Sequence, residues 1–132
     1  LARGAWEQAL AYGRERRTFG RPVADRQAVA FGLADLATRI DAARLLTWRA
    51  AALADTGAPF RAEASMAKLF ATETALRAAE VAIQVHGAYG VSREVPVSRL
   101  LGDAKVPESV EGTSALQRML LARLLGISDG EA

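Results

Sequence analysis

The sequence of 132 residues predicts an all-α fold, an up-and-down bundle of four helices. Apolar residues recur at the spacing of a helix that buries one face, and they do so along most of the chain. Glycine and proline gather in short breaks between these segments, and short connections join antiparallel helices in a bundle. We find no convincing strand and no internal repeat, so we predict one domain over residues 1–132.

The first helix is predicted from about Arg3 to Arg17, with Trp6 and Leu10 on its apolar face. It ends within residues 18–22, because Pro22 disfavours helical geometry in the residue that precedes it.

The second helix is predicted to begin near Asp25, a favourable N-cap residue, and to end at residues 56–59, Thr-Gly-Ala-Pro. A helix of about 30 residues is about 45 Å long, which favours a bundle. The third helix runs from about Phe60 to Gln84 and stops at residues 86–90.

A shorter helical piece is predicted over residues 96–101, followed by a loop through Lys105–Pro107. The last helix runs to about Gly126. Ser114 and Gln117 match the capping box at its start, in which Ser or Thr is followed three residues later by Glu or Gln.

The composition narrows the class of protein. The chain has no cysteine and a single histidine, His86, so we predict no disulfide and no metal site. No apolar run reaches the roughly 18 residues of a membrane span, and no signal peptide is visible. We therefore expect a cytoplasmic protein without a membrane span, which the absence of cysteine fits.

The charges argue against a nucleic-acid partner. The formal net charge is +2, and the basic residues are scattered along the predicted helices, whereas nucleic-acid binding usually needs a continuous basic face. Arg14, Arg16 and Arg17 form one short cluster that suits a single phosphate or pyrophosphate group. Arginine is also favoured at the C-terminal end of a helix, which is the simpler interpretation.

Arg16 and Phe19 lie three residues apart and share a face if the first helix continues that far. A cation beside an aromatic ring suits a nucleotide. The alternative, which these residues alone favour, is a helix end with Phe19 packed as a plug.

Residues 84–90, Gln-Val-His-Gly-Ala-Tyr-Gly, form a second motif. Its two glycines can expose the main chain to a ligand, although glycine more commonly serves to end a helix. A lone histidine at a helix end, such as His86, is more often structural than ligand-binding.

Glu111 precedes the last helix and is followed by Gly112, which lets a ligand approach the main chain closely. A carboxylate beside an open N–H is the arrangement that a general base needs to deprotonate carbon next to a polarised carbonyl. Acidic residues are also favoured near helix N-termini by the helix dipole, and on spacing alone this is the commoner explanation.

Six short motifs occur in one order between about Ala9 and Leu125. They are Glu15-Arg16-x-x-Phe19-Gly20-x-Pro22, Gln27-Ala28-Val29, Met66–Ala71, Gln84–Gly90, Asp103-Ala104-Lys105 and Glu111-Gly112-Thr113-Ser114. Each is weak alone, but in this order they resemble the C-terminal helical domain of the acyl-CoA dehydrogenase family.

The resemblance implies an activity. Glu111 matches the base that removes the α-proton of an acyl-CoA thioester, while the β-carbon loses a hydride to FAD, giving the trans-2-enoyl-CoA. Gly112 is expected next to the substrate, and Arg123 is expected to reach the CoA nucleotide. An electron-transfer flavoprotein or a similar acceptor is the expected redox partner.

The resemblance also implies two sets of FAD-binding residues. One set faces the cofactor of a neighbouring subunit and comprises Arg16, Phe19, Gln27, Gln84, His86 and Gly87. The other flanks the FAD of the same subunit and comprises Thr113 and Ala115. A shared cofactor requires an oligomer, and the family is usually tetrameric.

The sequence departs from the family pattern at four positions. Ala88 lies where the family usually has a glycine, and Gly102 lies where it usually has an arginine. Val110 replaces a frequent aromatic residue, and Ala115 replaces a common glutamate. The family's N-terminal helical and middle β domains are not found in residues 1–132, so we expect little dehydrogenase activity from this chain by itself. The alternatives are an acyl-CoA oxidase or related flavoenzyme on the same fold, or a non-catalytic helical assembly module.

Overall fold

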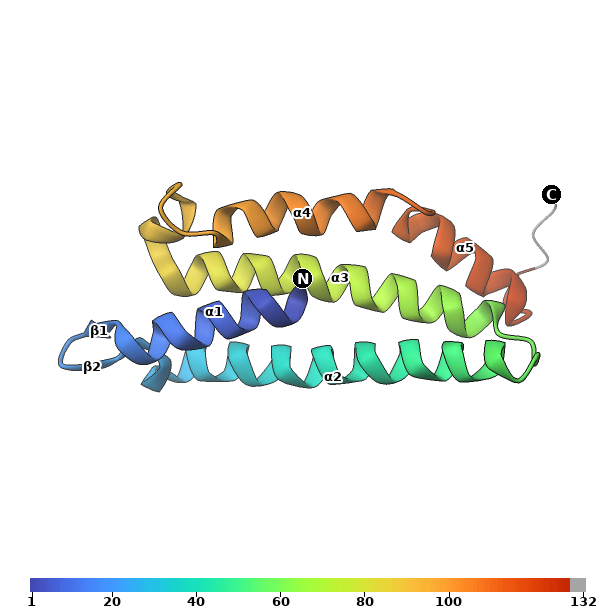
Figure 1. The fold of residues 1–132 in the computed structure, drawn as a ribbon, viewed down its shortest axis with the longest axis horizontal. Coiled ribbons are helices and arrows are strands. Elements are labelled where there is room, and N and C mark those ends of the chain that lie inside the picture. The colour runs from blue at the N-terminus through green and yellow to red at the C-terminus, as the bar shows by residue number, and fades with distance from the viewer. Residues whose placement is uncertain (129–132) are drawn as a thin grey trace.

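Helices make up most of the structure, a computed structural model that describes residues 1–128, and their arrangement confirms the predicted all-α bundle (Figure 1). Along the described chain they are α1 (Ala2–Glu15), α2 (Gln27–Asp55), α3 (Arg61–His86), α4 (Val97–Ser109) and α5 (Ser114–Leu124), with short 3₁₀ turns η1 (Val23–Asp25) and η2 (Gly87–Val91).

Helix α3 is the centre of the bundle and packs against α1, α2, α4 and α5. Consecutive helices run in opposite directions, except that α4 and α5 follow one another along the same side of α3 (Figure 1). The fourth helix of the bundle is therefore broken at residues 110–113. This break is where Glu111 lies.

Small side chains let the helices approach α3 closely. Ala78, Ala79 and Ala82 of α3 are almost completely inaccessible, and the main core cluster adds Leu33 and Leu36 from α2. Interiors pack as densely as organic crystals, so a stripe of alanine brings the neighbouring backbones close.

One polar contact joins α1 to α2 at this core. The indole N–H of Trp6 donates to the carbonyl of Leu33 at 2.8 Å. A half-buried tryptophan N–H needs such a partner, and the bond fixes the angle at which α1 lies on α2.

The prediction that the chain has no strand is wrong, because the structure contains one small β-hairpin. Strands β1 (Arg17–Thr18) and β2 (Arg21–Pro22) pair antiparallel, with Arg17 opposite Pro22 and Thr18 opposite Arg21. Phe19 and Gly20 turn between them with φ of 49° and 80°, the doubly left-handed geometry that suits a two-residue hairpin. Strands of two residues are too short to show an alternating pattern, and the hairpin makes α1 end at Glu15, two residues earlier than predicted.

The start of α2 also differs from the prediction. Asp25 lies in η1, and the N-cap position is held by Arg26, whose side chain makes no capping hydrogen bond. The predicted end is confirmed: α2 ends at Asp55, and Gly57 takes a φ of 70° just beyond it.

Helix α4 is longer than predicted. Residues 105–107 are helical, with Pro107 inside the last turn, so the predicted loop there is wrong. Pro107 has no main-chain N–H to donate. The helical hydrogen bonding nevertheless continues beyond it, because Val110 N–H donates to Val106 O at 3.0 Å. The helix therefore continues to Ser109.

The capping box predicted at Ser114 and Gln117 is wrong by one residue. Thr113 is the N-cap of α5, and its hydroxyl oxygen accepts from Leu116 N–H at 3.3 Å. The Ser114 hydroxyl oxygen is buried and has no hydrogen-bond partner among residues 1–128. The Gln117 carboxamide is used elsewhere, as a donor to the carbonyl of Glu111.

Between residues 1 and 128, no helix is long and apolar enough to cross a lipid bilayer.

The packing of the core predicts that truncating two side chains of α2 lowers the free energy of unfolding by different amounts. Leu36→Ala removes a side chain that is 1% exposed and should lower the free energy of unfolding by about 2–5 kcal/mol, because the neighbouring helices cannot close the cavity. Phe31→Ala, on the same helix but 60% exposed, should cost less than about 1 kcal/mol. Urea unfolding followed by circular dichroism measures both, and equal losses would contradict this packing.

Candidate active site and cofactor groove

The break between α4 and α5 exposes Glu111. Its φ of 55° is left-handed, at the position just after a helix where glycine is usual. Holding a glutamate in this region costs about 1–3 kcal/mol, and such strained residues cluster at functional sites. The strain therefore distinguishes Glu111 from an ordinary acidic residue near a helix N-terminus.

Gly112 is required by two features of the same turn. Its φ is 92°, and a Cβ at this position would lie 2.7 Å from Nε2 of Gln117. Any larger residue would have to shift the end of the Gln117 carboxamide that bonds the loop, and at this φ a side chain is strained whatever the space around it.

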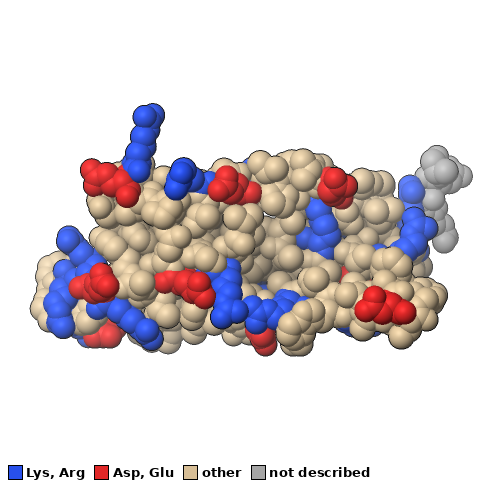
Figure 2. Space-filling view, viewed as in Figure 1, with Lys and Arg blue, Asp and Glu red and all other residues tan. Residues whose placement is uncertain are grey.

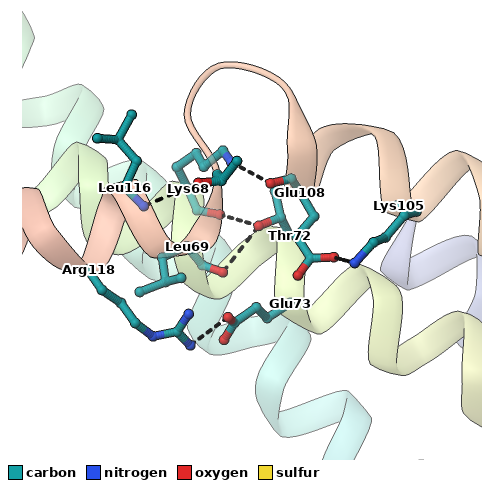
Figure 3. Close-up of polar contacts among 9 residues, drawn as sticks. Lys68, Leu69, Thr72, Glu73, Lys105, Glu108, Leu116 and Arg118 are labelled. Carbon is teal, nitrogen blue, oxygen red and sulfur yellow. Dashed lines mark hydrogen bonds and ion pairs between the residues drawn. The ribbon is translucent and has the colours of Figure 1, made fainter.

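Side chains from two other segments hold this turn. The Lys68 ammonium of α3 donates to Gly112 O and, at 3.4 Å, to Glu108 O in the last turn of α4. Figure 3 shows Lys68 directed at Glu108 from the neighbouring helix. From the α5 side, Gln117 Nε2 donates to Glu111 O at 3.2 Å. The loop is thus fixed by its main-chain carbonyls while the Glu111 carboxylate stays exposed.

A separate groove of about 810 Å³ lies between the end of α1, the hairpin and η2. It is lined by ten residues: Tyr12, Glu15, Arg16, Thr18, Val23, Val85, His86, Gly87, Ala88 and Tyr89. The structure therefore brings Arg16 together with His86 and Gly87, two motifs that lie about 70 residues apart in the chain.

His86 is fixed in this groove and only 7% exposed. Its Nδ1–H donates to Ala82 O at 2.7 Å, and its ring stacks on Tyr12 with centroids 4.2 Å apart. Because a carbonyl only accepts, Nδ1 carries the proton. His86 thus has a structural role, as predicted from its position, and still lines the groove.

The two glycines of this motif serve different purposes. Gly87, with φ of 62° and ψ of −142°, adopts a conformation almost restricted to glycine, and apart from its two chain neighbours no described atom lies within 4 Å of where its Cβ would be. The space beside it is therefore empty, although its N–H donates to Gln84 O. Gly90 is buried instead, because a Cβ there would lie 2.7 Å from Ile83 O. Of the two glycines, Gly87 is exposed and Gly90 is buried.

Tyr89 lines the same groove and has a perturbed acidity. The negative charge of Glu94 raises the pKa of the Tyr89 phenol above its usual range, because a nearby carboxylate disfavours the phenolate. The phenol therefore remains a neutral hydrogen-bonding group at the groove in neutral solution.

The structure contradicts the packed plug at Phe19 and the helical face that Phe19 was expected to share with Arg16. Phe19 is 97% exposed at the tip of the hairpin, so it is not a packed plug. The cation above its ring is Arg26, 5.4 Å from the ring centroid, rather than Arg16. Since α1 ends at Glu15, Arg16 and Phe19 do not share a helical face.

The other predicted site residues are dispersed. Gln27 is exposed at the start of α2, and Gln84 is exposed in the last turn of α3, where its carbonyl accepts from Gly87 N–H. Ala115 is exposed in the first turn of α5. Arg123 lines a second groove, of about 520 Å³, beside Lys68 and Gln117.

The sequence analysis assigned no site role to four residues that the structure places at the groove or at the turn. Tyr12 and Tyr89 line the groove, and Lys68 and Gln117 hold the Glu111 turn. Lys68 lies in a motif that was recognised, but nothing in its spacing indicates which carbonyls it contacts.

Charges of both signs are interspersed on the face shown in Figure 2, without a continuous basic surface on that face. Among the residues that the structure describes, no three His, Asp or Glu side chains are grouped as a metal site needs.

The family model for the acyl-CoA dehydrogenase C-terminal domain matches residues 1–126. The chain belongs to the acyl-CoA dehydrogenase family. A probable acyl-CoA dehydrogenase, YngJ of Bacillus subtilis, is 49% identical over 125 residues, 95% of this chain and 33% of that protein. The caffeyl-CoA reductase–Etf complex subunit CarC of Acetobacterium woodii is 42% identical over 95% of this chain and 33% of its own length.

A solved structure, the FAD complex of PigA, shares the fold with a TM-score of 0.92 and 28% identity over 96% of this chain and 33% of its own. The all-α domain architecture is therefore that of the family. The chain spans about a third of the length of the relatives that it matches.

The Glu111 turn predicts opposite effects for two glycine substitutions. Gly112→Ala should lower the free energy of unfolding by about 1–3 kcal/mol, because alanine is strained at this φ and collides with Gln117. Gly102→Ala, in α4 with no described atom from outside its own stretch of helix within 4 Å of the new Cβ, should raise it by about 0.5–1 kcal/mol. Thermal unfolding measures both, and a neutral Gly112→Ala would contradict the geometry of the turn.

Proposed function

We propose that this chain is the C-terminal domain of an FAD-dependent acyl-CoA dehydrogenase that forms a trans-2-enoyl-CoA from an acyl-CoA thioester. The observation that carries the proposal is Glu111: an exposed carboxylate in a left-handed turn between two helices, within a chain that belongs to this family. We assign the α-proton abstraction to this side chain.

Glu111 contributes two groups to the reaction. Its carboxylate takes the α-proton, and its main-chain N–H donates to the thioester carbonyl as negative charge develops there. Gly112 leaves room for the thioester beside this N–H. FAD, when bound, supplies the acceptor for the hydride that leaves the β-carbon.

The groove between α1 and η2 fits the nucleotide part of FAD. The Arg16 guanidinium suits a pyrophosphate, and Gly87, which has no side chain, leaves room for it, while the stacked rings of Tyr12 and His86 suit a flat base. We assign this groove to the FAD of a neighbouring subunit, and we assign Phe19, Gln27 and Gln84, which lie outside the groove lining, to the same cofactor. Thr113 and Ala115, at the start of α5, are assigned to the FAD of the same subunit.

A cofactor shared in this way requires a homo-oligomer, a dimer or a tetramer. Large apolar side chains support such an assembly: Phe31, Leu45 and Trp48 of α2 are each more than half exposed. We assign Arg123 to the CoA nucleotide, an electron-transfer flavoprotein or similar acceptor to reoxidation, and the cytoplasm as the location.

Glu111→Gln tests the proposed base. In an FAD-loaded full-length protein that contains this chain, the variant should lower kcat by about 10²–10⁴-fold, because the amide cannot accept the proton. The flavin absorbance should stay unchanged. Glu80→Gln, which alters an exposed ion pair with Arg77, is the control and should leave turnover near that of the unmodified protein. Turnover of Glu111→Gln at the same rate would remove Glu111 as the base.

The chain of 132 residues by itself should show little dehydrogenase activity. Glu111 and the groove are both open to solvent, and a thioester α-proton is abstracted efficiently only where water is excluded. The measurement is acceptor reduction and peroxide release after adding FAD and acyl-CoA to the purified chain. Rapid acceptor reduction would contradict the prediction, and rapid peroxide release would favour an oxidase.

A further inference from the structure

Lys68 is a half-buried ammonium whose hydrogen-bond partners in the described residues are main-chain oxygens. One, Glu108 O, belongs to the last turn of α4, and the other, Gly112 O, lies beyond Glu111. A cation is favoured where helical carbonyls end without partners, so Lys68 neutralises the C-terminal end of α4. The Lys68 side chain of α3 thus contacts the main chain both before and after Glu111.

Gln117 acts on the same turn from the opposite side. It is 7% exposed, and its Nε2 donates to Glu111 O at 3.2 Å. The same nitrogen occupies the space beside Gly112 in which a Cβ would lie at 2.7 Å. The carboxamide therefore both binds and packs against the peptide that joins Glu111 to Gly112.

Two consecutive carbonyls are consequently held by different helices. Glu111 O is bound from α5 and Gly112 O from α3, and both residues have positive φ. A glutamate seldom adopts this conformation without support. If either contact is lost, the turn gains access to ordinary backbone conformations, and the direction of the Glu111 N–H and side chain changes with them.

We propose that Lys68 and Gln117 are positioning residues, which hold the Glu111–Gly112 turn in its left-handed form and so aim the carboxylate and N–H of Glu111 at the substrate. The last clause rests on the proposed function. The hold on the turn is a property of this chain alone and can be measured without FAD or substrate.

Hydrogen–deuterium exchange of the chain tests the hold directly. Lys68→Met and Gln117→Met remove the donors but keep side-chain bulk. The amides of Val110 and Gln117, which close the ends of the turn through bonds to Val106 O and Thr113 O, should then exchange at least about tenfold faster. Lys68→Arg, which keeps a donor, should recover part of the protection.

Matched controls remove surface cations from α4 and α5, the helices on either side of the turn. Lys105 pairs with the Glu108 carboxylate at 2.5 Å and Arg118 with Glu73 at 2.6 Å, both visible in Figure 3. Lys105→Met and Arg118→Met should change exchange in the turn less than about twofold, since exposed ion pairs contribute little. Unchanged exchange in Lys68→Met and Gln117→Met would refute the proposal that these side chains hold the turn. If one variant does not fold cooperatively, the exchange rates of the other variant test the proposal.

Turnover separates positioning from mere stability. In the FAD-loaded full-length protein, Lys68→Met and Gln117→Met should lower kcat at least about tenfold and change KM less than about threefold, with partial rescue by Lys68→Arg. Faster exchange with unchanged kcat would overturn the positioning role. Full activity of Glu111→Gln would instead refute the proposed function, while the exchange data would still decide whether the turn is held.

Discussion

Helix α3 can contact every other helix because its sides are built from alanine where the neighbours approach. Ala78, Ala79 and Ala82 leave almost no surface accessible, so the neighbouring helices can approach α3 closely at these positions, while larger side chains of α3 such as Val85 complete the core. Close packing of this kind tolerates little displacement. It fixes where the first turns of α3 lie relative to α5, and Lys68, in one of those turns, can then reach the break in the fourth helix. The core and the candidate site therefore depend on the same helix.

The break itself shows how a bundle can present a carboxylate at a defined angle. A glutamate inside a continuous helix has its main-chain N–H and carbonyl bonded within that helix. At the junction of α4 and α5, Glu111 is free of that pattern, its carbonyl is bound by Gln117, and its side chain remains exposed. Thr113 restarts the helix two residues later by capping Leu116 N–H. The chain accepts strain at one residue, and the surrounding caps and side-chain donors offset it.

The sequence predicted the elements with long repeating patterns and missed those that depend on a few local bonds. The helices α1, α2, α3 and α5 were predicted close to their observed bounds, because apolar periodicity over many residues reports burial of one face. The hairpin at Phe19 and the continuation of α4 past Pro107 were missed, since each rests on one or two hydrogen bonds that leave no pattern. The grouping of Arg16 with His86, and the reach of Lys68, follow from packing between helices distant in sequence. Spacing along the chain contains no information about such contacts.

In the proposed enzyme, this chain sets the geometry of the Glu111 turn, and another surface must exclude water from the Glu111 carboxylate. The described chain holds the Glu111 turn by two side chains, Lys68 and Gln117, but the carboxylate is exposed, and the groove that suits a nucleotide is open. A carboxylate in water is well solvated and abstracts a thioester α-proton poorly, so a surface that covers this turn must provide the low dielectric. A preformed turn is an advantage in that arrangement, because the covering surface then needs only to exclude water and does not have to reorganise the base. The strained backbone of Glu111 therefore belongs in the rigid helical part of the protein. There the free energy of folding offsets the strain, and no substrate binding energy is needed to hold the base in place.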